Sequence, residues 1–515
     1  MSNLTVLKNI FANLCRGGAV ALSMLLLPPF LARILTKDAY GAWLLILQLS
    51  TYVSLLDLGI QTVIGRFVAH YNELGDTKKR DSIISSAIAI LTGSGSIAFV
   101  AIALLAWQLP RLFPDMPAAL QQDARLALMC VGGTLAVALP FSVFGAVFIG
   151  LQRYDIPAWI VGSTKIFAGV LVVLAAQASQ SIVMMAVMVG ITNLGAGLWQ
   201  YLAYRKIAAG YRISPQLISK KSAIEVAESC LSLSVSTLGL LIVSGLDTTI
   251  IGFYDYKSIP YYALAATLTN FVFGISISIL NTLIPVASSI GARNEPDSLG
   301  RLLVATTRYT VVLLIATNLP LILVSKTVIG LWVGADYAIA TSHLFELLVA
   351  ANFVRQVGSP YFTIAIGCGE HRKVILSPLI EAATNLIFSL LLTSRIGADG
   401  VAFGTLIGGF VSVGLHFFYN LPRTKKIFVA DKMALIVTVV KPVLLIVVPT
   451  ICLFALNNRY GNPTNIFLVF GPATILTAMS WFVLWEHILE PEDRRMAAEA
   501  VNKVMSKILK KKSLQ

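Results

Sequence analysis

Charged residues are scarce in this sequence. Asp, Glu, Lys and Arg together make up 12% of the 515 residues, about half of the roughly 25% that is usual in a soluble globular protein. Hydrophobic residues reach 57%. This balance excludes a soluble globular protein and indicates an all-α integral membrane protein.

Cysteine and catalytic signatures are also sparse. The five cysteines are scattered among apolar segments and form no CxxC pair, so we expect neither a disulfide nor a cysteine-ligated metal. The sequence has no GxxxxGK[ST] phosphate loop and no HExxH motif, which argues against a Walker-type ATPase and gives no sign of a metal site. Its loops are too short for a separate catalytic domain. We therefore predict that the protein is not an enzyme and needs no cofactor.

Long apolar runs dominate what is present. About fourteen stretches of roughly 20 residues are each long enough to cross a hydrocarbon core of about 30 Å as a helix. They are 10–35, 41–63, 83–107, 126–150, 156–176, 180–204, 226–253, 260–285, 302–325, 341–367, 374–394, 399–420, 434–456 and 465–489. The first continues through Pro28 and Pro29 without a small-residue cleavage site, so we interpret it as a spanning helix and not as a signal peptide.

Basic residues gather on alternate loops. By count, roughly 30 of the 39 Lys and Arg lie on one side of the predicted membrane, which the positive-inside rule places in the cytoplasm together with both termini. The net charge of +14 therefore reflects topology, and no nucleic-acid partner is expected. The final residues, 491–515, predict a basic amphipathic helix on the inner leaflet, with a frayed basic tail as the alternative.

The sequence also contains a weak internal repeat. A shift of 221 residues aligns Tyr40 with Tyr261 and Arg80 with Arg301, and a slightly smaller shift brings "FIGLQRY" over "AIGCGEH". Helix edges and loop lengths coincide at the same time, which is typical of transporters built from duplicated bundles. We predict two pseudo-symmetric six-helix lobes, 1–222 and 223–430, followed by a helix pair at 431–490 and the cytoplasmic tail at 491–515.

Polar side chains inside the apolar segments are the candidate functional residues, because an ionisable group at mid-membrane costs at least about 2.5–3.5 kcal/mol unless it faces a bundle interior or a wet cavity. The cations are Arg16, Lys165 and Arg355, and the acids are Asp57, Asp247 and Glu381. Amide side chains share their helix faces at Asn13, Asn270, Asn281 and Asn352. Together these residues predict a hydrophilic cavity between the lobes.

Each of these positions also has a structural interpretation. Arg16 is close enough to the cytoplasmic edge to extend its side chain to the interface. For Arg355 a structural ion pair is the alternative to lining the cavity, and for Asp57 and Asp247 it is a cation partner or the capping of a local kink. For Lys165 both readings stay open.

Three stretches resemble a known family. They are "LLDLGIQTVIGRFVAHYNELGD" at 55–76, "GLQRYD" at 150–155 and "LDTTIIGFYDYKSIPYYALAATLTN" at 246–270. In these stretches and over essentially its whole length, the chain is similar to the polysaccharide and O-antigen flippases (Wzx-like) of the multidrug, oligosaccharidyl-lipid and polysaccharide (MOP) exporter superfamily. The resemblance implies a V-shaped pair of lobes in the bacterial inner membrane that opens alternately to either side.

The same resemblance implies a substrate. It is an oligosaccharide linked to undecaprenyl diphosphate, an O-antigen, capsule or exopolysaccharide unit, moved from the cytoplasmic to the outer leaflet, with membrane lipids, a glycan polymerase and chain-length machinery as partners. Since Arg presents a donor fork matched to phosphate oxygens, Arg16, Arg355 and Lys165 would hold the diphosphate, and the amides would contact sugars. The three acids would serve coupling to H⁺ or Na⁺, or gating. Residues 434–489 would contact the polyprenyl tail or serve packing alone.

Two other transporters of this superfamily remain alternatives. A drug-cation antiporter would have acids in the cavity of its amino-terminal lobe, whereas the first helix here contains Arg16 and no acid. A lipid II flippase would share the fold and the anionic lipid carrier. A glycosyltransferase or polymerase would need a large loop that carries acids, which this sequence lacks.

Overall fold

The computed structural model of the chain describes residues 25–57, 59–208, 210–230, 245–374, 376–424 and 431–460, with Ala478 and Phe482. Within these residues every regular element is a helix, which confirms the all-α prediction. Arg16, Asn13 and the tail at 491–515 lie outside the described residues.

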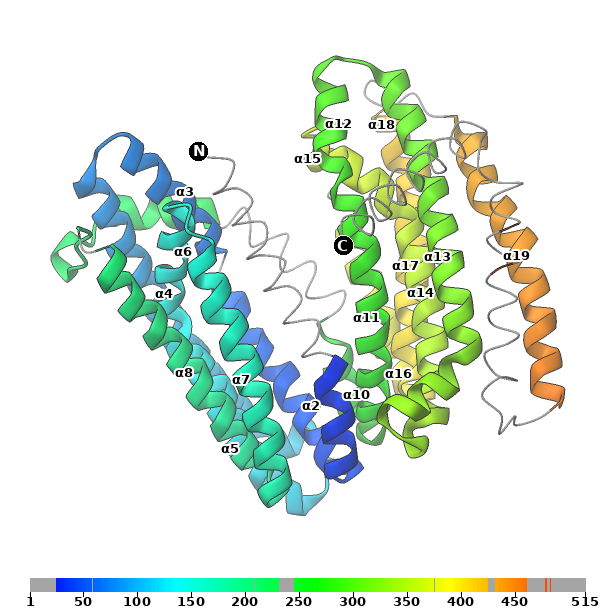
Figure 1. Cartoon of the computed structure of the whole chain (residues 1–515), viewed down its shortest axis with the longest axis horizontal. Coiled ribbons are helices and arrows are strands. Elements are labelled where there is room, and N and C mark those ends of the chain that lie inside the picture. Colours follow the sequence, from blue (N-terminus) through cyan, green and yellow to red (C-terminus); the bar gives the residue numbers. More distant parts are fainter. Residues whose placement is uncertain are drawn as a thin grey trace, which may run out of the picture. The chain divides into compact units, whose positions relative to one another are not determined.

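The helices follow one another with short connections (Figure 1). In the first half they are α2 (Lys37–Thr51), η1 (Tyr52–Asp57), α3 (Ile60–Glu73), α4 (Thr77–Leu112), α5 (Ala118–Ala138), η2 (Leu139–Phe141), α6 (Ser142–Gly150), α7 (Asp155–Ser179), α8 (Ile182–Ile207) and η3 (Pro215–Leu217). In the second half they are α10 (Asp247–Tyr254), η4 (Tyr256–Ser258), α11 (Ile259–Asn281), α12 (Leu283–Ala292), α13 (Pro296–Val333), α14 (Ala335–Gly367), α15 (His371–Val374), α16 (Leu376–Ile396), α17 (Asp399–Leu415), η5 (His416–Asn420), α18 (Leu421–Arg423) and α19 (Lys432–Tyr460).

Ten helical stretches among the described residues are long and apolar enough to cross a membrane. They coincide one to one with the predicted segments between 41 and 204 and between 260 and 420. α19 coincides with the thirteenth predicted segment, 434–456. The protein is therefore a multi-pass membrane protein.

The chain packs as two compact units. Unit 1 comprises residues 1–268, 329–344 and 382–405, and unit 2 comprises 269–328, 345–381 and 406–515. These units are defined by packing, whereas the lobes at 1–222 and 223–430 are defined by the internal repeat. The division into lobes therefore stays a prediction.

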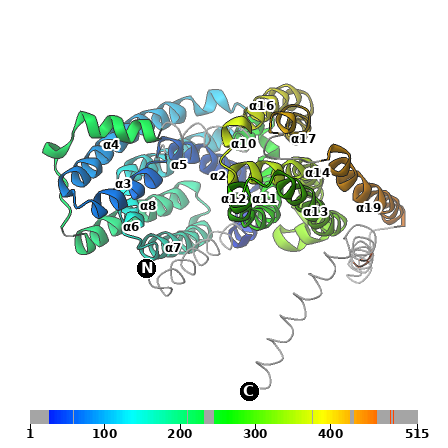
Figure 2. The same ribbon diagram turned by 90° about the horizontal axis from the view of Figure 1, so that it is seen from above.

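In unit 1, α4, α5, α8 and α7 lie side by side in that order, and α3 pairs with α6 (Figures 1 and 2). The core of this bundle joins Ile64 of α3, Ile84 of α4 and Phe148 of α6 with Tyr204 of α8. It also includes Val226, which belongs to the helical residues 220–230. The start of the seventh predicted span is thus part of the core of unit 1.

Unit 2 has two apolar cores. One joins Ala287 of α12 and Leu303 of α13 with Ile364 of α14. The other packs Ile315 of α13 against Ile446 of α19, so that α19 lies along the bundle edge (Figure 2). Both cores are close-packed by aliphatic side chains, as is usual where helices are buried against each other.

The internal repeat is visible in how corresponding helices end. After Gly150 and after Gly367 the chain turns through a residue in the left-handed region, Gln152 at φ 59° and Gly369 at φ 76°. In both turns the next residue donates its N–H to the carbonyl five positions earlier, at 2.8 and 2.9 Å. This is the Schellman pattern that closes helix carboxyl ends. The alignment of "FIGLQRY" with "AIGCGEH" is therefore confirmed in the backbone.

Several spans are interrupted. The second predicted helix is broken between Asp57, which ends η1, and Gly59, whose φ of 68° lies in the left-handed region before α3 begins. The fourth changes direction through η2, which contains Pro140, and the eighth through Thr282, between α11 and α12. Such breaks leave backbone groups without helical partners, and polar side chains are useful there.

Candidate functional site

An ion pair joins two of the predicted residues within unit 2. Nε of Arg355, on α14, lies 2.6 Å from Oε1 of Glu381, on α16. The two side chains are 17% and 11% exposed, so each charge needs the other, because an unpaired ion at this depth is strongly destabilising. The guanidinium carbon is also 6.0 Å from the ring centroid of Phe273. The ion pair that the structural interpretation of Arg355 requires is thus present.

α16 turns a polar face inward. Its buried polar residues recur every four positions, at Ser377, Glu381, Asn385, Ser389 and Thr393. Ser389 donates to Oδ1 of Asn385 at 3.0 Å, and Nδ2 of Asn385 donates to Thr405 of α17 at 3.2 Å. Ile387 and Leu391, on the other side, are exposed. Glu381 therefore belongs to a polar face that is buried in protein, as membrane helices require of polar groups.

A small cavity lies among α11, α13 and α14. Its lining includes Phe273, Asn318, Asn352 and Gln356. Asn352 donates to the carbonyl of Leu348 at 2.9 Å, which leaves its amide oxygen available. Gln356 is only 1% exposed and its Oε1 has no hydrogen-bond partner in the described part of the chain. An acceptor buried in this way is unusual and calls for a donor, from water or a ligand.

The predicted amide stripe of α11 is accessible. Asn270, Gly274, Ser278 and Asn281 follow one another at helical spacing and all four are exposed. The predicted residues of this helix therefore share one open face.

Lys165 is exposed on α7, although Ala158 and Val172, seven positions to either side, are buried. Residues seven apart share a helix face. Lys165 thus emerges from the protein-facing side of α7 and not from the ridge of exposed Ile166, Val170 and Leu174.

Asp57 and Asp247, both in unit 1, lie at helix interruptions. Asp57 accepts a hydrogen bond of 2.9 Å from Ser142, the first residue of α6. Asp247 opens α10, where a carboxylate faces free N–H groups and the positive end of the helix dipole. It also accepts a hydrogen bond of 2.6 Å from Tyr262. Each carboxylate thus has a hydrogen-bond donor within the protein, which makes the acid less costly in an apolar run.

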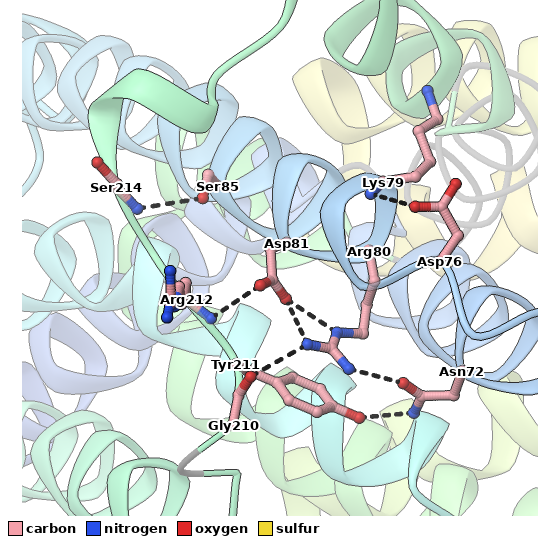
Figure 3. Close-up of polar contacts among 10 residues, drawn as sticks. All are labelled: Asn72, Asp76, Lys79, Arg80, Asp81, Ser85, Gly210, Tyr211, Arg212 and Ser214. Atoms are coloured by element: carbon pink, nitrogen blue, oxygen red, sulfur yellow. Dashed lines mark hydrogen bonds and ion pairs between the residues drawn. The ribbon is translucent and has the colours of Figure 1, made fainter.

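Sequence reasoning missed a buried cluster around Arg80, which it counted only as a topology charge. Arg80 and its neighbour Asp81 are each 6% exposed, and Nη2 of Arg80 lies 2.7 Å from Oδ1 of Asp81. The guanidinium lies 3.6 Å from the ring centroid of Tyr211 and donates to Asn72 and to the carbonyl of Gly210 (Figure 3). The connection after α8 is therefore fastened to α4.

Asp81 and Ser85 also bind the backbone of the connection after α8. Oδ2 of Asp81 accepts the N–H of Arg212 at 3.1 Å, and Ser85 accepts the N–H of Ser214 (Figure 3). The repeat partner of Arg80 is different, because Arg301 is exposed and donates to Ser298. In the sequence this cluster shows only as the adjacent pair Arg80 and Asp81, because Gly210 is 130 residues away.

An ion pair and a hydrogen bond attach the helical residues 220–230 to α4 and α3. Oε2 of Glu225 lies 2.8 Å from Nζ of Lys79, and Tyr71 donates to Oε1 at 3.0 Å. Burial alone would raise the pKa of Glu225, but the hydrogen bonds from Lys79 and Tyr71 and the charges of Lys79 and Lys221 outweigh it and lower that pKa from 4.5. Glu225 is thus ionised at neutral pH.

No three His, Cys, Asp or Glu side chains come together as metal ligands among the described residues. The buried cation of unit 2 is Arg355, with Glu381 as its carboxylate partner and Phe273 nearby. An arginine whose terminal amines are open can bind an anionic polar group.

Comparisons with known proteins identify the fold and a relative. The solved structure of the lipid II flippase MurJ in an inward closed conformation superimposes with a TM-score of 0.67 at 14% identity, covering 94% of this chain and 98% of MurJ. An inward-facing multidrug resistance transporter of the MATE family, in the MOP superfamily, gives 0.58 at 13% identity, covering 78% and 94%. At such low identities these matches show the fold alone.

The probable low-salt glycan biosynthesis flippase Agl15 of Haloferax volcanii is 22% identical over 205 residues, which is 39% of this chain and 43% of that protein. The match spans less than half of its length. The family model described as "Polysaccharide biosynthesis protein" matches residues 6–291, more than half of this 515-residue chain. The chain belongs to the polysaccharide biosynthesis protein family.

Proposed function

We propose that the protein flips an oligosaccharide linked to undecaprenyl diphosphate from the cytoplasmic to the outer leaflet of the bacterial inner membrane by alternating access. Family membership and the glycan flippase among the relatives support this proposal. The observation that carries it is Arg355, a guanidinium inside the membrane-spanning helix α14 that keeps its terminal amines available. A diphosphate supplies the matching anion.

The other polar residues extend this proposal. Lys165 and Arg16 would share the diphosphate with Arg355, and Asn13, Asn270, Asn281 and Asn352 would contact sugar hydroxyls. Asp57 and Asp247 would act in gating or in coupling to H⁺ or Na⁺. α19 and residues up to 489 would contact the polyprenyl tail, with a glycan polymerase and chain-length machinery as partners.

The distribution of Lys and Arg over the alternate loops supports an orientation of the chain in the membrane. On the proposed topology both termini and the connection fastened by Arg80 lie in the cytoplasm, and the loop before α2 lies outside. A transporter with this role performs no covalent chemistry, in agreement with the flippase and transporter names of the proteins it resembles.

A lipid II flippase is the second candidate, because the MurJ structure covers nearly the whole chain. Both candidates move a diphosphate-linked lipid, so the site does not separate them. Complementation of a strain depleted of its lipid II flippase separates the two candidates. Rescue of growth favours the lipid II flippase, and rescue of surface glycan alone favours the oligosaccharide flippase.

The test of the proposed function is a deletion strain that produces a glycan dependent on this protein. Wild-type protein restores surface glycan, and Arg355→Ala reduces it although the protein still inserts in the membrane. Arg301→Ala removes an exposed cation of the same unit and serves as the matched control. Resistance to cationic drugs without any change in surface glycan would instead indicate a drug antiporter.

A further inference from the structure

The contact between Arg355 and Glu381 uses only one edge of the guanidinium. Glu381 accepts from Nε, and neither Nη1 nor Nη2 has a hydrogen-bond partner among the described residues. Pairs of arginine and carboxylate are frequently bidentate, with two parallel hydrogen bonds. Here the fork formed by the two terminal amines stays open.

The surroundings hold the guanidinium in this orientation. Gly409 of α17 lets the two helices approach so closely that a β-carbon there would lie 2.8 Å from Cγ of Arg355. Phe273 lies beside the guanidinium on the α11 side. The stem of Arg355 is therefore confined by α17, and Glu381 confines its Nε.

A small cavity lies on the Phe273 side of the guanidinium. Phe273, which lies near the guanidinium, also lines the cavity that contains Asn352 and the unpartnered Oε1 of Gln356. The cavity is only about 10 Å³, enough for about one water molecule, so the phosphate would be contacted by the open Nη edge itself.

We propose that Glu381 is a positioning residue for phosphate recognition: it holds Arg355 by Nε so that the Nη edge receives one phosphate of the lipid-linked substrate. This inference rests on the proposed function and deepens it. It replaces the role in ion coupling or gating that the sequence indicated for Glu381. Both partners belong to unit 2, so carboxylate, guanidinium and phosphate form one ternary contact within it.

Two effects of the carboxylate are separable. Its hydrogen bond orients the guanidinium, while its charge weakens anion binding through repulsion and so favours release. Glu381→Gln keeps an oxygen that accepts from Nε and removes the charge. Glu381→Ala removes both. The comparison of Gln with Ala therefore measures orientation, and the comparison of wild type with Gln measures charge.

The experiment uses the full chain in lipid nanodiscs with farnesyl diphosphate as the anionic probe and farnesol as the neutral one. We expect wild type to prefer the diphosphate, Glu381→Gln to bind it about three- to tenfold more tightly than wild type, and Glu381→Ala to bind at least about threefold more weakly than Glu381→Gln. Surface glycan should nevertheless fall in Glu381→Gln because release is slower. Glu346→Gln alters another α14 carboxylate, which accepts from Ser325, and should leave binding unchanged.

A double variant shows whether a loss of binding is caused by a loss of folding. Arg355→Gln with Glu381→Gln replaces the buried ion pair by a neutral one and should keep its melting temperature near that of wild type while losing the preference for diphosphate. If it retains that preference, or if the Gln and Ala variants bind alike, the positioning role is wrong although the proposed function stands. If wild type itself does not prefer the diphosphate to farnesol, both the positioning role and the proposed function are wrong.

Discussion

Gly367, at the end of α14, lies against the main chain of α12 so closely that a β-carbon on it would come within 2.7 Å of the carbonyl oxygen of Ile284. Gly150, its repeat partner at the end of α6, approaches the carbonyl of Gly65 on α3 at the same 2.7 Å. In both cases the next nearest contact is the β-carbon three positions further along the facing helix. The two halves therefore share a close helix crossing as well as a backbone turn.

These crossings should not tolerate a methyl group. Gly150→Ala and Gly367→Ala should each lower the free energy of unfolding by about 1–3 kcal/mol, because a methyl pressed against backbone forces the helices apart. Thermal unfolding of the detergent-purified protein measures this. Gly169→Ala and Gly414→Ala, where nothing lies within 4 Å, should be neutral or slightly stabilising; equal losses at all four positions would contradict the crossing argument.

The cluster of Arg80 should protect the connection after α8. Arg80→Gln leaves Asp81 buried without its cation and should cost about 3 kcal/mol. It should also speed cleavage by trypsin at Arg212, whose N–H is held by Asp81. Limited proteolysis in nanodiscs, read by mass spectrometry, measures the cleavage at Arg212. Thermal unfolding measures the loss of stability. Arg301→Gln, at the exposed repeat position, should change stability by no more than about 0.5 kcal/mol, and unchanged cleavage in Arg80→Gln would refute the fastening.

Glu225 should make the stability of unit 1 dependent on pH. Its pKa in the folded chain is below the ordinary 4.5, so it favours the folded state at pH values above 4.5, and this contribution is lost as the pH falls through the lowered value. Glu225→Gln should therefore unfold at a lower temperature than wild type at pH 7. The difference should shrink on acidification below pH 4.5, and a difference that grows there would show the opposite sign of linkage.

The two sequence halves meet within unit 1 at the end of the bundle proposed to face outward. A β-carbon on Gly41 of α2 would lie 3.3 Å from Cγ of Pro260 at the start of α11. Tyr40 and Tyr261, a repeat pair, both contact Tyr337, with ring centroids 6.4 and 5.7 Å from its own. Alternating access requires these contacts to separate.

Cysteines at Gly41 and Pro260, in a background without the native cysteines, should therefore cross-link under oxidation and stop transport. Reduction should restore surface glycan, and each single cysteine should be inert to the oxidant. A cross-linked protein with full transport would mean that this end of the bundle does not open.

Much of the fold follows from the sequence alone. A helix must satisfy its own backbone hydrogen bonds in lipid, so long apolar runs mark the spans with little ambiguity, and ten of them are found where predicted. The alignment of Gly150 with Gly367 was also visible, although the turns and close crossings that follow from these glycines were not. The prediction that Glu381 faces away from lipid followed from the cost of placing an ionisable group in hydrocarbon.

Tertiary structure decided which polar groups meet. Arg355 and Glu381 are 26 residues apart on different helices, and helical spacing fixes a face but not its partner. Arg80 and Arg301 occupy equivalent places in the repeat, yet only Arg80 is buried, because the connection that carries Tyr211 folds back over α4. Spacing along one helix is local and can be read from the chain, whereas the partner of a charge depends on packing between distant segments, which only the folded protein brings together.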